Sequence, residues 1–138
     1  MLRKRNMPLP EELYEGVFYV TQFTRGTVLE NAVAVDRVRM APWKDSTKHR
    51  HRDSETVLFI EQGFAIITID DMKCIVKPGD RVPIPKGAWH NVLALQDEFI
   101  FTSIQCPPIH DEATGRHDLE VMEQENSGDA KITFFHTL

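Results

Sequence analysis

The middle of the chain is almost continuous β-strand and turn, and this pattern constrains the fold more than any other feature. One pair of β-rich segments flanks Asp70-Asp71 and another flanks Gln96-Asp97, which predicts two tight hairpins. The predicted strands of this region are residues 55–62, 64–69, 72–76, 91–95 and 98–104. Short strands at this spacing, with few helical patterns among them, predict an all-β chain folded as an antiparallel β-barrel or jelly roll.

Both ends of the chain extend this pattern. Residues 17–23 and 32–40 are rich in β-formers and predict two earlier strands, and residues 131–135 predict a last one. Residues 1–12 carry two prolines and few apolar residues, so we expect an N-terminal arm there. The remaining residues, 13–138, are expected to form a single domain.

A polar segment interrupts the strand pattern at residues 107–128. Within it only residues 117–125 predict a short helix. The segment is expected to be either a lid beside the barrel mouth or plain surface. It carries His110 and His117, each of which could act as an acid or base near neutral pH. The favoured reading is that both are ordinary surface histidines.

Composition and charge exclude several classes of protein. The chain of 138 residues has 41% hydrophobic and 27% charged residues, which is ordinary for a soluble globular domain. Its formal net charge of −5 argues against nucleic acid or an anionic membrane as a partner. No apolar run approaches the roughly 18 residues that a membrane span needs, and no apolar signal core follows the basic start. We therefore expect a cytoplasmic protein.

Residues 49–55, His-Arg-His-Arg-Asp-Ser-Glu, carry three potential metal ligands within one strand's length. Successive side chains of a strand point to opposite faces, so His49, His51 and Glu55 are expected on the same face. Two imidazoles and a carboxylate suit a divalent transition metal. A fourth ligand is expected from His90, which follows a Pro-Lys-Gly turn at the start of another strand.

These two segments resemble the paired motifs of the cupin superfamily. The second cupin motif reads Gly, five residues, Pro-x-Gly, two residues, His, three residues, Asn. It is matched in register by Gly79, Pro85, Gly87 and His90. The first motif reads Gly, five residues, His-x-His, three or four residues, Glu, six residues, Gly, and it is matched by His49, His51 and Glu55.

Three positions depart from the motifs. Trp43 stands where the leading glycine belongs, the closing glycine is displaced by one to Gly63, and Ala94 replaces the terminal asparagine. None of the three is a metal ligand, so the departures concern local turns and pocket shape rather than the metal.

The resemblance implies a small single-domain RmlC-like cupin, whose jelly roll is also called a double-stranded β-helix, with its motif core at residues 43–105. It implies a metal site of three histidines and one glutamate, formed here by His49, His51, Glu55 and His90. Similar cupins hold iron or manganese there, and nickel and zinc are further possibilities. We expect Val57, Phe59, Val92 and Phe101 to line an apolar pocket beside the metal, which would suit a small organic molecule.

Three functions stay open at this point. The first is a metal-dependent enzyme acting on a small oxygen-bearing substrate, with dioxygenase chemistry ahead of isomerase or lyase chemistry. The second is a cupin that binds a small molecule, such as a sugar or an organic acid, without turnover. The third is a metal-free sugar-nucleotide epimerase, against which the full set of ligand positions argues. No catalytic residue beyond the metal ligands is predicted.

The sequence also predicts a homodimer. Residues 56–60 are largely apolar on both faces of their strand, so a second sheet or another subunit is expected to cover the outer face. The proline-bearing arm could cross to that subunit.

Overall fold

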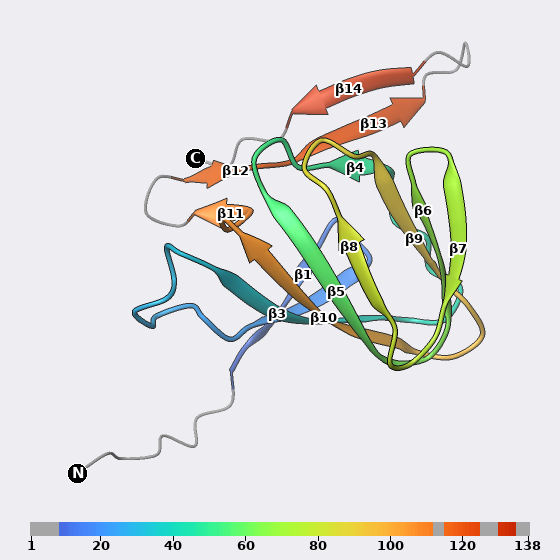
Figure 1. The fold of residues 1–138 in the computed structure, drawn as a ribbon, viewed down its shortest axis with the longest axis horizontal. Helices are drawn as coiled ribbons and strands as arrows, with labels where there is room; N and C mark the ends of the chain where they lie inside the picture. The colour runs from blue at the N-terminus through green and yellow to red at the C-terminus, as the bar shows by residue number, and fades with distance from the viewer. Residues whose placement is uncertain (1–8, 112–114, 125–129, 135–138) are drawn as a thin grey trace.

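The computed structural model of the chain describes residues 9–111, 115–124 and 130–134, and these residues form two facing antiparallel sheets of six strands each (Figure 1). In spatial order, the first sheet contains β1 (Glu11–Tyr14), β2 (Phe18–Gln22), β3 (Ala34–Met40), β10 (Phe99–Cys106), β5 (Glu55–Gln62) and β8 (Arg81–Ile84). The second contains β14 (Ala130–Phe134), β13 (Glu120–Gln124), β4 (His49–Arg50), β9 (His90–Ala94), β6 (Ala65–Ile69) and β7 (Met72–Val76). Two short strands, β11 (His110–Asp111) and β12 (Arg116–His117), form a separate two-stranded sheet and lie between β10 and β13 in the sequence.

The hydrophobic core lies between the two sheets. Alternate residues of strands such as β5, β8 and β9 point inward, as the period of two in a strand predicts. In β5, for example, Leu58 and Ile60 are buried, whereas Phe59 on the outer face is 42% exposed. The largest fully buried apolar side chains are Phe99, Met40 and Ile67, which come from both sheets. The all-β jelly roll predicted from the sequence is therefore confirmed.

One of the two predicted hairpins forms and the other does not. Strands β6 and β7 pair around Asp70-Asp71, as predicted. Strands β9 and β10 flank Gln96-Asp97, but β9 belongs to the second sheet and β10 to the first. The turn therefore carries the chain from one sheet to the other instead of closing a hairpin. The inward side chains of the two strands face one another across the core.

The short helix predicted over residues 117–125 is wrong. Residues Glu120–Gln124 form β13, which pairs with β4 through the register partners Glu120↔Arg50 and Val121↔His49. Both Glu120 and Val121 are buried, so tertiary pairing overrides the weak local helix preference.

The N-terminal arm predicted over residues 1–12 lies partly outside the described residues, and its last two residues belong to β1 at the edge of the first sheet. Within the part of the chain that the structure describes, no helix is long and apolar enough to span a membrane.

Two turn positions explain the glycine departures seen in the sequence. Trp43, which replaces the leading glycine, has a left-handed backbone with φ 63°, a conformation that suits glycine. Gly63, the displaced closing glycine, has φ 79°, and a Cβ atom there would clash with the backbone oxygen of Glu98. The displaced Gly63 thus still supplies a residue that tolerates a left-handed backbone, whereas at the leading position Trp43 adopts this conformation although it is not glycine.

Candidate metal centre

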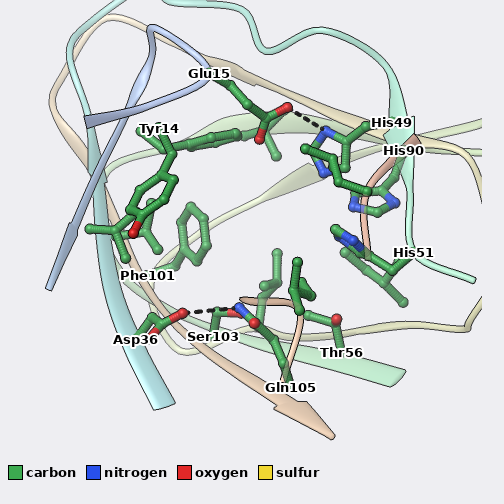
Figure 2. A pocket seen from close by; sticks show the side chains of 18 of the residues that line it. Tyr14, Glu15, Asp36, His49, His51, Thr56, His90, Phe101, Ser103 and Gln105 are labelled. Carbon is green, nitrogen blue, oxygen red and sulfur yellow. Dashed lines mark hydrogen bonds and ion pairs between the residues drawn. The ribbon is translucent and has the colours of Figure 1, made fainter. Parts of the chain in front are cut away.

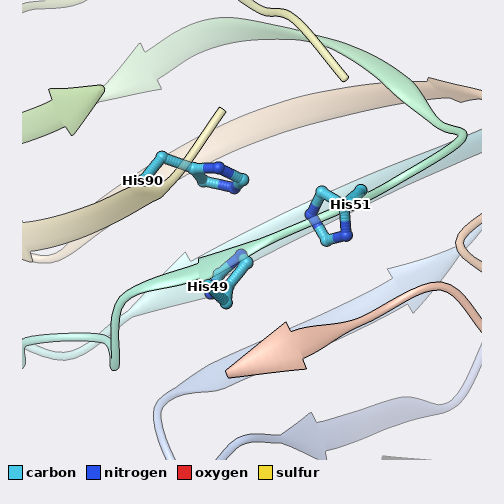
Figure 3. A group of neighbouring side chains, drawn as sticks. All are labelled: His49, His51 and His90. Atoms are coloured by element: carbon cyan, nitrogen blue, oxygen red, sulfur yellow. The ribbon is translucent and has the colours of Figure 1, made fainter. Parts of the chain in front are cut away.

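Three histidines meet on the inner face of the second sheet (Figure 3). His49 in β4 and His90 in β9 are direct partners across an antiparallel pair, so their side chains leave the sheet on the same face. His51 follows two residues after His49. All three side chains are buried, and one ring nitrogen from each lies within 4.8 Å of the others. The structure thus brings together three of the four predicted ligands.

A backbone carbonyl fixes the orientation of each ring. The Nδ1 atom of His49 lies 3.1 Å from the Thr47 oxygen, that of His51 2.8 Å from the Asp118 oxygen, and that of His90 2.9 Å from the Ala88 oxygen. A carbonyl only accepts hydrogen bonds, so Nδ1 must carry the proton in all three rings. The lone pair is then left on Nε2 of each histidine.

Burial keeps these three imidazoles neutral. Desolvation lowers the pKa of His49 and of His51 to about 4, and it lowers the pKa of His90 well below its usual range. A metal requires a neutral imidazole with a free lone pair. The cluster offers three such nitrogens within one short span, so the donor set fits a divalent transition metal such as iron, manganese, nickel or zinc.

Glu55 does not join the histidines. Its side chain is exposed, and its Oε2 atom accepts a hydrogen bond from the Lys86 backbone N–H at 3.0 Å. The prediction that it shares their face assumed one continuous strand from His49 to Glu55. The strand instead ends at Arg50, and residues 51–54 separate it from β5, which shifts the alternation by one residue.

The same shift changes which side chains of β5 line the pocket. Thr56 and Leu58 point inward, not the predicted Val57 and Phe59. The predictions for Val92 and Phe101 are confirmed, since both line the pocket. Thr56 therefore occupies the inner position for which the sequence pattern suggested a glutamate.

Glu15 supplies a carboxyl group that the sequence analysis missed. It lies in the turn between β1 and β2, and its Oε1 atom is 3.4 Å from Nδ1 of His49 (Figure 2). Burial raises the pKa of Glu15 to about 7. A carboxylate beside the protonated nitrogen of a metal-binding histidine is a common way to orient the ring. No motif links residues 15 and 49, so the sequence carried no signal for this pair.

Asp118 holds the turn that positions His51. Its carboxylate accepts hydrogen bonds from three consecutive backbone N–H groups, those of Arg52, Asp53 and Ser54, at 2.8, 3.0 and 2.9 Å. Its own backbone oxygen faces Nδ1 of His51. One residue thus fixes both the break in the strand and the orientation of a candidate ligand, and the sequence analysis missed it.

His110 is not the ordinary surface histidine that the sequence favoured. It lines the pocket, stacks on Tyr14 with ring centroids 4.9 Å apart, and lies with Nδ1 2.9 Å from Nδ1 of His117. Burial lowers the pKa of His110 to about 4. The described part of the segment after β10 therefore contributes to the pocket wall.

The histidine cluster opens into a pocket with a cavity volume of about 100 Å³ between the two sheets (Figure 2). Apolar side chains form much of its wall, including Phe18, Val38, Leu58, Val92, Phe101 and Leu119. A second group of polar residues, Asp36, Thr56, Ser103 and Gln105, lines the pocket from the first sheet. Burial raises the pKa of Asp36 to about 6, although the hydrogen bond from Gln105 opposes the shift.

The family comparison agrees with the fold. Residues 36–102 match the family model described as "Cupin domain". These residues therefore form a cupin domain, as the resemblance of the motifs predicted. Among curated proteins, no sequence matches this chain.

Solved structures of several other proteins share the fold. The chain is similar to a Cupin 2 conserved barrel domain protein from Salinispora arenicola, with 18% identity, 81% of this chain and 92% of that chain covered, and a TM-score of 0.65. The chain is also similar to KdgF from a Halomonas species, with 15% identity, 76% of this chain and 90% of that chain covered, and a TM-score of 0.64. The similarity to oxalate decarboxylase from Bacillus subtilis has 21% identity and a TM-score of 0.65. It covers 76% of this chain but 28% of that chain, so this chain spans little more than a quarter of that enzyme. At these identities the likeness shows the fold.

Proposed function

We propose that this cupin is a metal-dependent enzyme that acts on a small oxygen-bearing organic molecule. The observation that carries the proposal is the set of three buried, neutral imidazoles whose Nε2 atoms are free, at the side of a cavity of about 100 Å³. A structural zinc site is closed by four protein ligands, whereas a site with three protein ligands keeps a position open for substrate.

Each part of the pocket has a role in this proposal. His49, His51 and His90 would hold the metal, with iron or manganese first and nickel or zinc as alternatives. When bound, the metal would supply a Lewis acid for an oxygen atom of the substrate or, if ferrous, a means of using molecular oxygen. Glu15 and the three backbone carbonyls orient the rings, and the apolar wall excludes water around the bound molecule.

Dioxygenase-type chemistry is the first candidate, because three nitrogen ligands leave room for both oxygen and substrate. Isomerase or lyase chemistry is the second, and the oxalate decarboxylase similar in fold is an enzyme. The remaining alternative is a cupin that binds a sugar or an organic acid without turnover, which would use the same pocket.

The metal is tested first. Protein purified without chelator or affinity metal is analysed by mass spectrometry, with His49→Ala beside the wild type and His117→Ala as the control. We expect about one equivalent of metal per chain in the wild type and the control, and loss of it in His49→Ala. Equal metal content in all three proteins would contradict the proposed metal site.

Turnover is tested second, on the metal-loaded protein. Oxygen uptake and product formation are followed across small carboxylates, phenols and polyols. Oxygen consumption coupled to product would support a dioxygenase, and product without oxygen uptake would support an isomerase or lyase. Saturable binding without product would favour the binding alternative.

We also propose a cytoplasmic homodimer with no nucleic-acid or membrane partner. The exposed Phe59 on the outer face of β5 supports the homodimer. The net charge of −5 supports the absence of a nucleic-acid or anionic-membrane partner. Sedimentation at micromolar concentration should show a species of twice the 15.9 kDa chain mass, and Phe59→Asp should shift it toward the monomer. A wild-type protein that sediments only as the monomer would contradict the proposal.

A further inference from the structure

A buried polar patch on the first sheet also faces the pocket. Asp36 of β3 and Ser103 of β10 are direct cross-strand partners, and so are Gln105 of β10 and Thr56 of β5. Partner side chains lie on the same face of a sheet, so these four form one patch across three neighbouring strands. All four are buried, and Figure 2 shows them along a different side of the pocket from the three imidazoles.

Hydrogen bonds within the patch fix its orientation. The Nε2 group of Gln105 donates to Oδ2 of Asp36 at 3.2 Å and to Oγ of Ser103 at 2.9 Å. Turning the amide over would place its oxygen against the Asp36 carboxylate, so the orientation shown is the favourable one. The amide oxygen of Gln105 is therefore directed away from these partners.

Three buried oxygens of the patch are left without a partner. Oδ1 of Asp36, Oε1 of Gln105 and Oγ1 of Thr56 have no hydrogen-bond partner among the residues that the structure describes. A buried polar group without a partner destabilises a fold by about 1–3 kcal/mol. The three oxygens belong to side chains of adjacent strands that all line one pocket, which is consistent with hydrogen-bond donors of a ligand as their partners.

The charges of the pocket restrict what those donors belong to. No lysine or arginine is among the described residues that line it, while Asp36 and Glu15 both do. A second carboxylate on a ligand would meet oxygens rather than cations at this patch, so a dicarboxylate such as oxalate fits poorly. Hydroxyl groups fit well, because each donates one hydrogen bond and brings no charge.

We propose that Asp36, Gln105 and Thr56 form a second subsite that binds neighbouring hydroxyl groups of the substrate, so that the substrate is a small polyhydroxylated molecule. The proposal rests on the proposed function, in which an oxygen group of the same molecule is held at the histidine cluster. It narrows the substrate class from any oxygen-bearing molecule to one with hydroxyl groups at the end remote from the metal.

The test compares two small acids of equal charge and chain length on the metal-loaded protein. Glycerate carries hydroxyl groups on both carbons beyond its carboxylate, and propanoate carries none. We expect titration calorimetry to give glycerate a dissociation constant at least about tenfold lower, the factor that a hydrogen bond to a charged group supplies. Equal affinities would mean that water satisfies the patch, which would overturn the subsite.

Two isosteric variants locate the effect. Thr56→Val removes the hydroxyl, and Asp36→Asn removes the charge and replaces one acceptor with a donor. Each should reduce the preference for glycerate severalfold while the metal content stays that of the wild type. Thr102→Val, on the same strand as Gln105 but bonded to the exposed Glu61, is the matched control and should leave the preference unchanged. A preference that survives both pocket variants would overturn the assignment of these residues.

Two further arms separate the possible failures. β-Alanine carries an ammonium group in place of the hydroxyls, and its binding more tightly than glycerate would overturn the hydroxyl assignment. If His49→Ala retains the metal, the proposed metal site is wrong. If His49→Ala loses the metal but the wild type binds glycerate and propanoate equally, the subsite alone is wrong.

Discussion

Trp43 holds a backbone conformation that an L-residue adopts at a cost. Its φ is 63° and its side chain is 64% exposed, so little buried surface offsets the strain. We expect Trp43→Gly to raise the free energy of unfolding by about 0.5–1 kcal/mol, since the lost strain exceeds the entropy that glycine adds to the unfolded chain. Urea denaturation measures the change.

The converse substitution at Gly63 is the control. Gly63→Ala combines φ 79° with a clash against the backbone of Glu98, so it should lower the free energy of unfolding by about 2 kcal/mol or more. A stabilised Gly63→Ala, or a destabilised Trp43→Gly, would show that the turns do not obey this backbone preference.

A metal measurement tests whether Glu55 lies outside the ligand set. The Glu55 carboxylate accepts a hydrogen bond from Lys86 on the outside of the barrel, so Glu55→Gln should leave metal content and affinity within about twofold of the wild type. His51→Ala, measured beside it, should lose the metal. If Glu55→Gln loses the metal as well, the ligand set predicted from the sequence is the correct one.

The strand β13 and the turn before it support the candidate metal centre from outside the ligand set. The Asp118 carboxylate accepts three backbone hydrogen bonds from the turn after His51, and Glu120 pairs with Arg50 at 2.8 Å. Asp118→Asn keeps the shape but removes the charge and one acceptor atom. We expect it to destabilise the protein by about 2–3 kcal/mol and to weaken metal binding about tenfold or more.

Calorimetric unfolding and a competition titration with a metal-sensitive dye measure both effects. Asp97→Asn is the matched control, because Asp97 is exposed in the turn between β9 and β10. An Asp118→Asn protein that loses stability but keeps full metal affinity would show that the orientation of His51 does not depend on this turn.

Most strands in the middle of the chain were predictable from the sequence because they are rich in β-formers and are bounded by turn residues, and β5 begins and ends at the predicted residues. The two motifs likewise placed His49, His51 and His90 together. What the sequence could not show depends on contacts between distant residues. The outward turn of Glu55 depends on Asp118, which lies 63 positions later, and Glu15 reaches His49 from a different sheet. The crossing at Gln96-Asp97 depends on which sheet each strand joins.

The buried titratable groups together set how the stability of the metal-free protein depends on pH. Four histidines (His49, His51, His90 and His110) have lowered pKa values, so between about pH 6.5 and 4 the unfolded chain binds protons that the folded chain does not. Glu15 and Asp36, with raised pKa values of about 7 and 6, act in the opposite direction. Four groups outweigh two, so stability should fall as the pH is lowered from 7 to 5.

Urea unfolding at half-unit pH steps measures this slope on chelator-treated protein. Each uncompensated proton contributes about 1.4 kcal/mol per pH unit. His51→Ala removes one of the four histidines, so its slope should be shallower than that of the wild type. A metal-free protein that becomes more stable on acidification would contradict the buried, neutral state of the cluster.

The contact between Asp118 and the turn after His51 also affects when the candidate metal centre can form during synthesis. On the ribosome both histidine motifs emerge well before residue 118, and until then the three N–H groups of residues 52–54 lack their acceptor. A nascent chain that already contains all three histidines therefore does not yet hold His51 in place. Binding of the proposed metal is therefore expected only after translation of the segment that follows the second motif.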